Sequence, residues 1–459
     1  MSVNISESTS RRNIGGLVSL LGAAAFLAVL DGSAVTASLD ALSTSFRTPL
    51  EAIVWVTTAY LMACGAVLPL VGWLVARLGG RTTFLIGLVA FLAGSLLTGA
   101  AWSLPSLLVF RMLQGLGGGI LEPAAIAVAA ASAPRERVGW VMGRFSLIIN
   151  IAPVLGPLLG ALLSDHGLWR AIFLVNVPVG AAILLVALRV LPRAEPANTE
   201  AARPDLLGIA LLAPGFTVGL FALNRWGAGG SAAVAWWSAL VAAVLLVSYV
   251  LHALRTHRTP VLDLRLLRIP ELAAALGVMA TVGFTMFTQL TVLPMLAETR
   301  YGLHGIARGL LVSALGVGLL VSMVNAGRLS DRFGPRPLVV GGSLVNAAGL
   351  ALVAVVHCSW PLPALLAVFV VIGLGFGSVA SPSFASVYRT LSPEAAAQGT
   401  TALFMTVQLF ASLGVTVLGA VLGAAARDGY TWTFAVLTVV ALAAATLGAR
   451  LPGRARAAQ

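Results

Sequence analysis

Long apolar stretches separated by short polar connectors run through almost the whole chain. Each stretch has about the 20 residues that an α-helix needs to cross a hydrocarbon core about 30 Å thick. The pattern predicts an all-α integral membrane protein with fourteen transmembrane helices. They are expected near residues 16–38, 51–75, 83–101, 106–131, 139–164, 171–191, 205–223, 232–252, 270–296, 307–326, 337–357, 363–387, 398–425 and 432–449.

The composition agrees with a membrane protein. Of the 459 residues, 59% are hydrophobic and 10% are charged, whereas soluble domains carry about 25% charged residues. Such a chain has too little polar surface for a water-soluble globule, which argues against a soluble enzyme. The two cysteines and five histidines are scattered, so neither a disulfide framework, a metal site nor a cofactor is expected.

The basic residues are all arginines, and they are unevenly distributed. Of the 28, 20 lie in the N-terminal segment, the connectors after even-numbered spans and the C-terminal tail, and six lie in the other connectors. Positively charged connectors stay on the cytoplasmic side of a membrane. Both termini are therefore expected in the cytoplasm, with the protein in the inner membrane of a bacterium. No basic face remains for nucleic acid.

A ten-residue segment occurs twice, at 72–81 and 327–336. Each copy ends the second span of a group of six spans, on the cytoplasmic side. The chain is therefore expected to comprise a cytoplasmic N-terminus (1–15), a six-helix bundle (16–191), two extra helices with their connectors (192–269), a second six-helix bundle (270–449) and a tail (450–459). Repeated bundles are typical of secondary transporters. The shared positions are Gly72, Leu74, Arg77, Gly79 and Arg81 in the first copy and Gly327, Leu329, Arg332, Gly334 and Arg336 in the second.

Two residues of opposite charge lie inside the apolar spans. Asp31 is in the first span and Arg111 is in the fourth, and the helical rise places each about 8 Å from the outer edge of the membrane core. An unpaired charge at this depth is costly, so an ion pair or a shared water-filled cavity is expected. One interpretation is a proton site, in which a nearby Arg111 favours the ionised form of Asp31. The other is a fixed structural pair between spans 1 and 4.

Glu122 is a second acid within the fourth span. It lies eleven residues after Arg111, which returns it to nearly the same helix face. Gly115, Gly118 and Gly119 lie between the two and let another helix approach closely. Glu122 is interpreted as an attractor of cationic substrate or a second proton carrier. The alternative is an acid that reaches water at the membrane surface, or a neutral, hydrogen-bonded one.

Span 5 contains Pro153, Gly156, Pro157 and Gly160, which predict a bent helix with one face free of large side chains. Elsewhere, aromatic, methionine and amide side chains are candidates for a substrate pocket, because aromatic faces attract organic cations and methionine adapts to varied shapes. Packing within the bundle is the alternative explanation for each. The candidates are Trp55, Tyr60, Asn150, Phe284, Met286, Phe287, Gln289, Phe404, Met405 and Gln408.

Taken together, these segments resemble the major facilitator superfamily, and within it the fourteen-span drug:proton antiporter branch of multidrug exporters. The resemblance covers essentially the whole chain and is carried by residues 30–37, 72–81, 111–118, 152–160 and 169–180. It implies proton-driven export, with Asp31 and Arg111 at the coupling site and the two ten-residue segments at the cytoplasmic gate.

The chain also departs from the family pattern. Ala76 stands where the first loop motif normally has an acid, whereas the second copy keeps Asp331. In the family this acid holds the cytoplasmic side together, so the latch of the first half is expected to be weak or supplied elsewhere. In span 13, Val407 occupies a position where relatives often have arginine.

The expected function is therefore proton-coupled antiport of hydrophobic compounds, cationic ones included, by alternating access. Its partners are a small-molecule substrate, protons and the lipid bilayer, and the monomer is the expected functional unit. A narrow exporter of one metabolite or antibiotic, for self-resistance, is the alternative among transporters. A non-transporting membrane sensor or scaffold is the alternative from another class.

Overall fold

The computed structural model describes residues 3–453 except 37, 135–136, 192–204, 228–230, 257–259, 304–306, 308, 358, 392 and 425–427. Within these residues the regular structure is helical, which confirms the predicted all-α membrane fold. Twelve of the described helices are long and apolar enough to cross a membrane, and α14 (Leu310–Phe333), which bends by 41°, would be a thirteenth. The expected connector 192–204 and most of the expected tail lie outside the described residues.

The fifth expected span is broken into two helices. α7 (Val138–Asn150) and α8 (Ala152–Asp165) meet at Ile151. Pro153 lies in the first turn of α8 and has no N–H to continue the hydrogen bonding of α7, which explains the break. Each piece is too short to cross a membrane alone, so this span is not among the twelve.

The chain divides into two compact units. Unit 1 comprises residues 1–134, 144–217 and 256–262. Its first helix, α1, begins before residue 16, where the sequence predicted the first span to start. Two short helices, α2 and α3, lie in the connector between the first two spans. The described helices of unit 1 are α1 (Val3–Thr36), α2 (Leu39–Phe46), α3 (Leu50–Ile53), α4 (Trp55–Leu78), α5 (Gly80–Gly99), α6 (Leu104–Ala131), most of α7, α8, α9 (Trp169–Leu174), α10 (Asn176–Val190) and the start of α11 (Leu206–Gly227).

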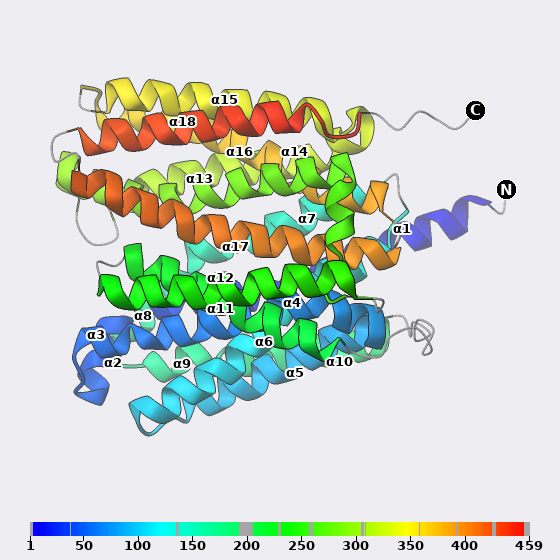
Figure 1. The fold of residues 1–459 in the computed structure, drawn as a ribbon, viewed down its shortest axis with the longest axis horizontal. Helices are drawn as coiled ribbons and strands as arrows, with labels where there is room; N and C mark the ends of the chain where they lie inside the picture. The colour runs from blue at the N-terminus through cyan, green and yellow to red at the C-terminus, as the bar shows by residue number, and fades with distance from the viewer. Residues whose placement is uncertain are drawn as a thin grey trace. The chain divides into compact units, whose positions relative to one another are not determined.

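Within unit 1, α6 packs between α4 and α5, while α1 contacts α6, α8 and α10. Figure 1 shows α4, α5 and α6 running alongside one another in blue and cyan. An apolar cluster that includes Val35, Ile53, Leu107 and Trp169 joins the ends of α1, α4, α6 and α9 to the two connector helices. This cluster fixes the depth of α1 relative to α6, the two helices that carry Asp31 and Arg111.

Unit 2 comprises residues 135–143, 218–255 and 263–459. It therefore includes the first residues of α7 as well as the C-terminal half of the chain. Its most extensive helix contacts are those of α14 with α16, of α13 with α17, and of α15 with both α16 and α18. Besides α14, its described helices include α12 (Ala232–Arg255), the short 3₁₀ helix η2 (Leu264–Arg268), α13 (Pro270–Tyr301), α15 (Pro335–Val356), α16 (Leu362–Thr390), α17 (Pro393–Ala424) and α18 (Gly429–Gly448).

The core of unit 2 is a continuous apolar cluster that includes Leu293, Leu350, Phe369, Phe434 and Leu437. The extra helix α11 contacts α17, where the Thr416 hydroxyl donates a hydrogen bond to the Leu223 carbonyl at 2.8 Å.

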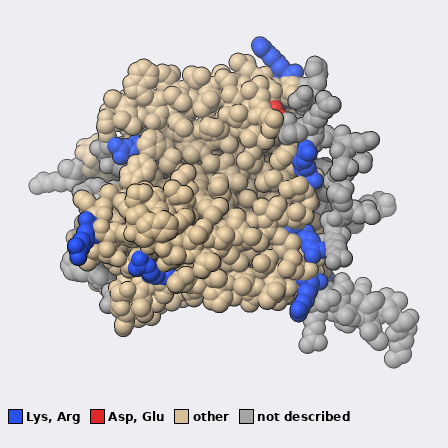
Figure 2. Space-filling view, turned by 90° about the horizontal axis from the view of Figure 1, so that it is seen from below, with Lys and Arg blue, Asp and Glu red and all other residues tan. Residues whose placement is uncertain are grey.

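Large apolar side chains are exposed along the outside of the helices. Leu185 is 60%, Val439 66% and Val355 79% exposed, and such a surface is typical of contact with lipid. Uncharged side chains make up most of the described surface in Figure 2, where charged side chains are few. This is the distribution that a bilayer requires, because a charge facing hydrocarbon is costly.

Candidate functional site

Asp31 and Arg111 form a buried ion pair in unit 1. Nη1 of Arg111 lies 2.5 Å from Oδ2 of Asp31, and both side chains are fully buried. α6 begins with a reciprocal cap in which the backbone N–H groups of Ser103 and Ser106 each donate to the other's hydroxyl. Arg111 therefore lies two turns inside a well-defined helix start. The structure joins the two charges that the sequence analysis placed at similar depth.

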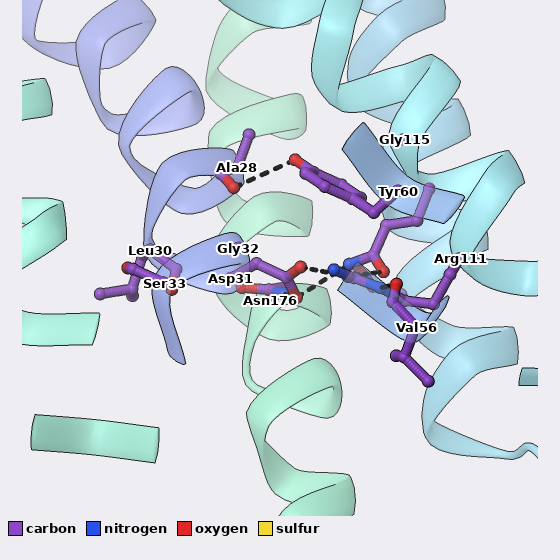
Figure 3. Close-up of polar contacts among 12 residues, drawn as sticks. Ala28, Leu30, Asp31, Gly32, Ser33, Val56, Tyr60, Arg111, Gly115 and Asn176 are labelled. Atoms are coloured by element: carbon purple, nitrogen blue, oxygen red, sulfur yellow. Dashed lines mark hydrogen bonds and ion pairs between the residues drawn. The ribbon is translucent and has the colours of Figure 1, made fainter. Parts of the chain in front are cut away.

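Further contacts surround the guanidinium. Nε of Arg111 donates to the Val56 carbonyl of α4 at 3.3 Å. The Tyr60 ring lies 4.2 Å and the Phe173 ring 5.5 Å from the guanidinium carbon, which adds a cation–π attraction. The Tyr60 hydroxyl donates to the Ala28 carbonyl of α1 at 3.1 Å. Figure 3 shows Tyr60 beside Arg111, with Asp31 and Asn176 converging on the same point.

Three neutral polar residues complete this cluster. Nε2 of Gln114 donates to Oδ1 of Asp31 at 2.9 Å and to the Ser95 hydroxyl at 2.8 Å. Nδ2 of Asn176 donates to the same oxygen of Asp31 at 2.8 Å. None of the three was predicted from the sequence as a site residue. Gln114 had a usable signal, since it lies one turn after Arg111 on the same helix, and Asn176 lies alone in an apolar run before Pro178.

We call Asp31, Arg111, Gln114, Ser95 and Asn176 the acid cluster. Its members come from α1, α6, α5 and α10, and it is closed to solvent in this structure because each side chain is buried. Chemically, the cluster holds one carboxylate with a cation and two amide donors around it. The guanidinium balances the carboxylate charge, and the two amides donate to its other oxygen.

The span 5 motif packs against the helix that carries Asp31. A side chain at Gly156 would overlap the Ser33 hydroxyl, and one at Gly160 would overlap the backbone of Ala34. The Ser33 hydroxyl lies 3.3 Å from the Ala152 carbonyl, and the Ser38 hydroxyl donates to the Gly160 carbonyl at 3.1 Å. α8 therefore touches α1 within one turn of Asp31, so displacement of either helix affects the other. Pro157 lies in α8 between the two glycines.

The repeated ten-residue segments form the same turn twice. Gly79 has φ 80° and ψ 153°, and Gly334 has φ 85° and ψ 166°. These angles are accessible only to glycine, so both positions require it. Each N–H donates to the carbonyl four residues before, Val75 in the first turn and Ser330 in the second. The structure thus repeats what the sequence repeats, between α4 and α5 and between α14 and α15.

The arginines of the two segments differ in their contacts. Arg77 lies 5.5 Å from the Trp73 ring, and Arg332 lies 5.2 Å from the Phe333 ring. Arg81 donates to the Leu188 carbonyl at 2.8 Å, whereas the side chain of Arg336 is exposed.

Asp331 caps the start of α7 within unit 2. Its carboxylate accepts hydrogen bonds from the backbone N–H groups of Gly139 at 2.9 Å and Trp140 at 2.8 Å, and from Nη2 of Arg389 at 2.6 Å. Gly327 and Gly139 pack closely. A side chain on Gly327 would overlap the Gly139 carbonyl, and a side chain on Gly139 would overlap the Gly327 carbonyl. An acid at a helix N-terminus is favourable because the free N–H groups there carry partial positive charge.

In the alignment of the two halves, alanines stand opposite both members of this ion pair. Ala76 stands opposite Asp331 in the repeat, and alignment of the glycine runs 115–119 and 373–377 places Ala131 opposite Arg389. Neither alanine carries a charge, so these two positions cannot form an ion pair like that of Asp331 with Arg389.

A family model of the Major Facilitator Superfamily matches residues 21–303 and 275–458. The chain belongs to this superfamily. Its family and fold are therefore those of membrane transporters, and the resemblance to multidrug exporters found in the sequence is confirmed.

The relatives carry names from drug resistance. The chain is 31% identical over 403 residues to the multidrug resistance protein B homolog of Mycobacterium tuberculosis, covering 87% of this chain and 74% of that protein. It is 28% identical to the tetracenomycin C resistance and export protein of Streptomyces glaucescens, covering 88% and 74%. The fold matches the proton:xylose symporter XylE with a TM-score of 0.65, 17% identity and 97% of each chain covered.

Glu122 lies outside the acid cluster of this transporter. It is half-buried on α6, eleven residues after Arg111 and near enough to the Cys64 thiol of α4 to interact with it electrostatically. The glycines before it let α4 pack tightly, since side chains at Gly115 and Gly119 would overlap the backbones of Tyr60 and Cys64.

The candidate pocket residues have diverse environments. Tyr60 belongs to the surroundings of Arg111, Asn150 donates to the Ser146 carbonyl of its own helix, and Gln289 is fully buried. Phe284 and Met405 are buried, whereas Trp55 is 41% and Phe287 38% exposed. Met286, Phe404 and Gln408 are partly buried.

The second half has apolar residues where the first half has its charge. In the same glycine-run alignment, Phe369 stands opposite Arg111 and Ile372 opposite Gln114. Both are fully buried, and the Phe369 ring packs 6.3 Å from that of Phe434. A small cavity in unit 2 is lined by uncharged side chains, both apolar ones and polar ones such as Thr285, Ser343 and Asn346.

Proposed function

We propose that this transporter is a proton-coupled antiporter that exports hydrophobic compounds, cationic ones included. The observation that carries the proposal is the fully buried Asp31 in an apolar span, held by Arg111. A buried ion pair is weak as a stabilising device, because two charges lose their hydration. Ionisable residues inside a membrane more often serve transport. The relatives named for multidrug resistance support export as the direction.

In the proposed cycle, Asp31 takes up a proton from the outer side while the transporter is open outward, and Arg111 withdraws. Alternating access then exposes the site to the cytoplasm, where the proton leaves and a substrate enters. The close contact of α8 with α1 would link the two events. Glu122 is proposed to attract cationic substrates or carry a second proton, and the candidate pocket residues to line the substrate path.

We also propose the cytoplasmic membrane of a bacterium as the location, with both termini in the cytoplasm and the monomer as the working unit. The two six-helix bundles, 16–191 and 270–449, would move against each other, with the two extra helices between them in the sequence. The Gly72–Arg81 and Gly327–Arg336 turns would then lie at the cytoplasmic gate, with Asp331 as its acidic latch.

A proton-flux measurement tests the proposal. In inverted membrane vesicles with an imposed pH gradient, adding substrate is expected to dissipate the gradient for the wild type but not for Asp31→Asn. Equal responses from the two proteins would reject Asp31 as the coupling acid. Glu122→Gln is the matched carboxylate-to-amide change on α6, and it is expected to weaken export of cations more than of neutral compounds.

A narrow exporter of one natural product is the second candidate. The relative named for tetracenomycin C resistance and export favours it. Growth of cells that express the transporter on a panel of toxic compounds separates the two. Protection against several unrelated compounds supports a multidrug exporter, whereas protection against one chemical class supports the narrow exporter.

A further inference from the structure

Asn176 has a position unlike the other members of the acid cluster. It is the first residue of α10, at the point where span 6 is interrupted after α9. Pro178 explains the interruption, because it has no N–H to bond the Leu174 carbonyl. The Asn176 side chain is 1% exposed, and its Nδ2 donates to Oδ1 of Asp31 at 2.8 Å.

The other end of this amide has no partner. Among the described residues, none donates a hydrogen bond to Oδ1 of Asn176, although the atom is buried. A buried carbonyl oxygen without a hydrogen bond is unfavourable. While Asp31 is ionised, the Asn176 side chain therefore has an oxygen that accepts no hydrogen bond.

Gln114 differs because both ends of its amide are occupied. Oε1 accepts from Nη1 of Arg111 at 2.7 Å, while Nε2 donates to Asp31 and to Ser95. Rotating this amide by half a turn would turn its N–H groups toward the guanidinium, which also only donates. Gln114 is therefore held in one orientation by three hydrogen bonds, whereas the Asn176 amide makes a single one, to Asp31.

Protonation of Asp31 reverses what its neighbour must supply. An ionised carboxylate only accepts hydrogen bonds, whereas a carboxylic acid also has an O–H that needs an acceptor. Arg111 faces Oδ2, so the proton added from solvent belongs on Oδ1, the oxygen that Asn176 contacts. Because an amide NH2 and an amide oxygen are nearly equal in size, half a turn of the Asn176 amide exchanges them without repacking.

We propose that Asn176 senses the protonation state of Asp31 by rotating its amide: Nδ2 donates to the ionised carboxylate, and Oδ1 accepts from the protonated acid. Asn176 is then a positioning residue of proton coupling, at the interruption of span 6. This inference rests on the proposed function, in which Asp31 takes up a proton. It deepens that function by naming the group that stabilises the protonated form in a buried site.

The other charged and titratable groups near Asp31 come from α4 and α6. Arg111 faces it directly, and Tyr60 and Cys64 lie close enough to interact with it electrostatically. Arg81 of α5 and Arg170 of α9 bond to carbonyls elsewhere, and Arg189 of α10 is exposed. Tyr60 already donates its hydroxyl to Ala28, and of the two amides that contact Asp31 it is Asn176 whose oxygen accepts no hydrogen bond.

Infrared difference spectroscopy tests the rotation directly. The reconstituted full-length transporter, with 13C-labelled asparagine, is measured at neutral and acidic pH. Acidification is expected to produce a carboxylic acid band that is absent in Asp31→Asn. In parallel, one labelled asparagine carbonyl band is expected to shift to lower frequency, because that oxygen gains a hydrogen bond.

Asn176→Gln assigns the band, because it keeps an amide at the site but removes the label. The shifted band is expected to vanish in this variant and to persist in Asn346→Leu, which removes another buried asparagine. A carboxylic acid band without a labelled carbonyl shift would overturn the role of Asn176 and leave the proposed function standing. No carboxylic acid band assignable to Asp31 would overturn the proposed function itself.

Discussion

At the scale of single residues, the chemistry of this transporter is concentrated in one buried carboxylate and its donors. Arg111 satisfies one oxygen of Asp31, and two amides satisfy the other. These contacts join α1 to α6 and to α10, so the charge state of Asp31 bears on how three helices fit together. Removal of one partner therefore leaves a buried charge uncompensated.

Arg111→Gln is expected to lower the free energy of unfolding by about 3–5 kcal/mol, the usual cost of breaking a buried ion pair on one side. The double variant Asp31→Asn/Arg111→Gln is expected to recover most of this loss, because no unpaired charge remains. Thermal unfolding of the purified proteins in detergent measures both effects. A double variant as unstable as Arg111→Gln would show that the charge pairing is not the cause.

At the scale of helices and turns, two devices fix where helices begin. One is the glycine turn that separates α4 from α5 and α14 from α15. The other is the Asp331 carboxylate at the start of α7, which lies about 190 residues earlier in the chain. The first device is local, whereas the second joins distant segments within unit 2.

Gly334→Ala is expected to destabilise the protein by about 1–3 kcal/mol, because alanine is strained at φ 85°. Gly341→Ala is the matched control, since a Cβ there meets nothing within 4 Å and the backbone is helical. Melting temperatures in detergent compare the two. Equal losses would contradict the backbone explanation.

Asp331→Ala is expected to cost about 1–2 kcal/mol of stability through loss of the α7 cap, and to slow transport if the latch works in the cycle. Asp428→Ala is the control, because Asp428 stands at the N-cap of α18 without a side-chain cap bond. Thermal unfolding and substrate flux are measured for both. A loss as large in Asp428→Ala would argue against a specific capping role.

At the scale of the whole molecule, the two halves repeat a helix arrangement but divide the chemistry. The first half holds the Asp31–Arg111 pair, and the second half holds the Asp331–Arg389 pair. Phe369 stands opposite Arg111, and Ala76 and Ala131 stand opposite Asp331 and Arg389. The repeat is therefore structural, and the charged groups are specialised.

The arginine distribution predicts which connectors face the cytoplasm. In a background without Cys64 and Cys358, His166→Cys is expected to react with a membrane-impermeant maleimide on intact cells. Arg336→Cys is expected to react only after the membrane is permeabilised. Both native side chains are exposed and lie in different connector regions. Labelling in the opposite order would reverse the proposed orientation.

Much of the architecture follows directly from the amino-acid pattern. A hydrocarbon core fixes the length of each crossing segment and forces its backbone to bond within a helix. Helix existence therefore depends on local residues alone. Gly79 and Gly334 stood out as shared positions of the ten-residue repeat, and the structure added that both have a positive φ. Asp31 and Arg111 stood out because a charge inside an apolar run is rare.

What the pattern could not supply was the direction in which each helix faces. Asn176 meets Asp31 across 145 residues, and Asp331 meets Trp140 across 191. Helical periodicity orders side chains around one axis but does not say which neighbour each face contacts. That choice comes from packing among many helices, as at Gly160 against Ala34. The partners of the acid cluster therefore emerged only when the helices were assembled.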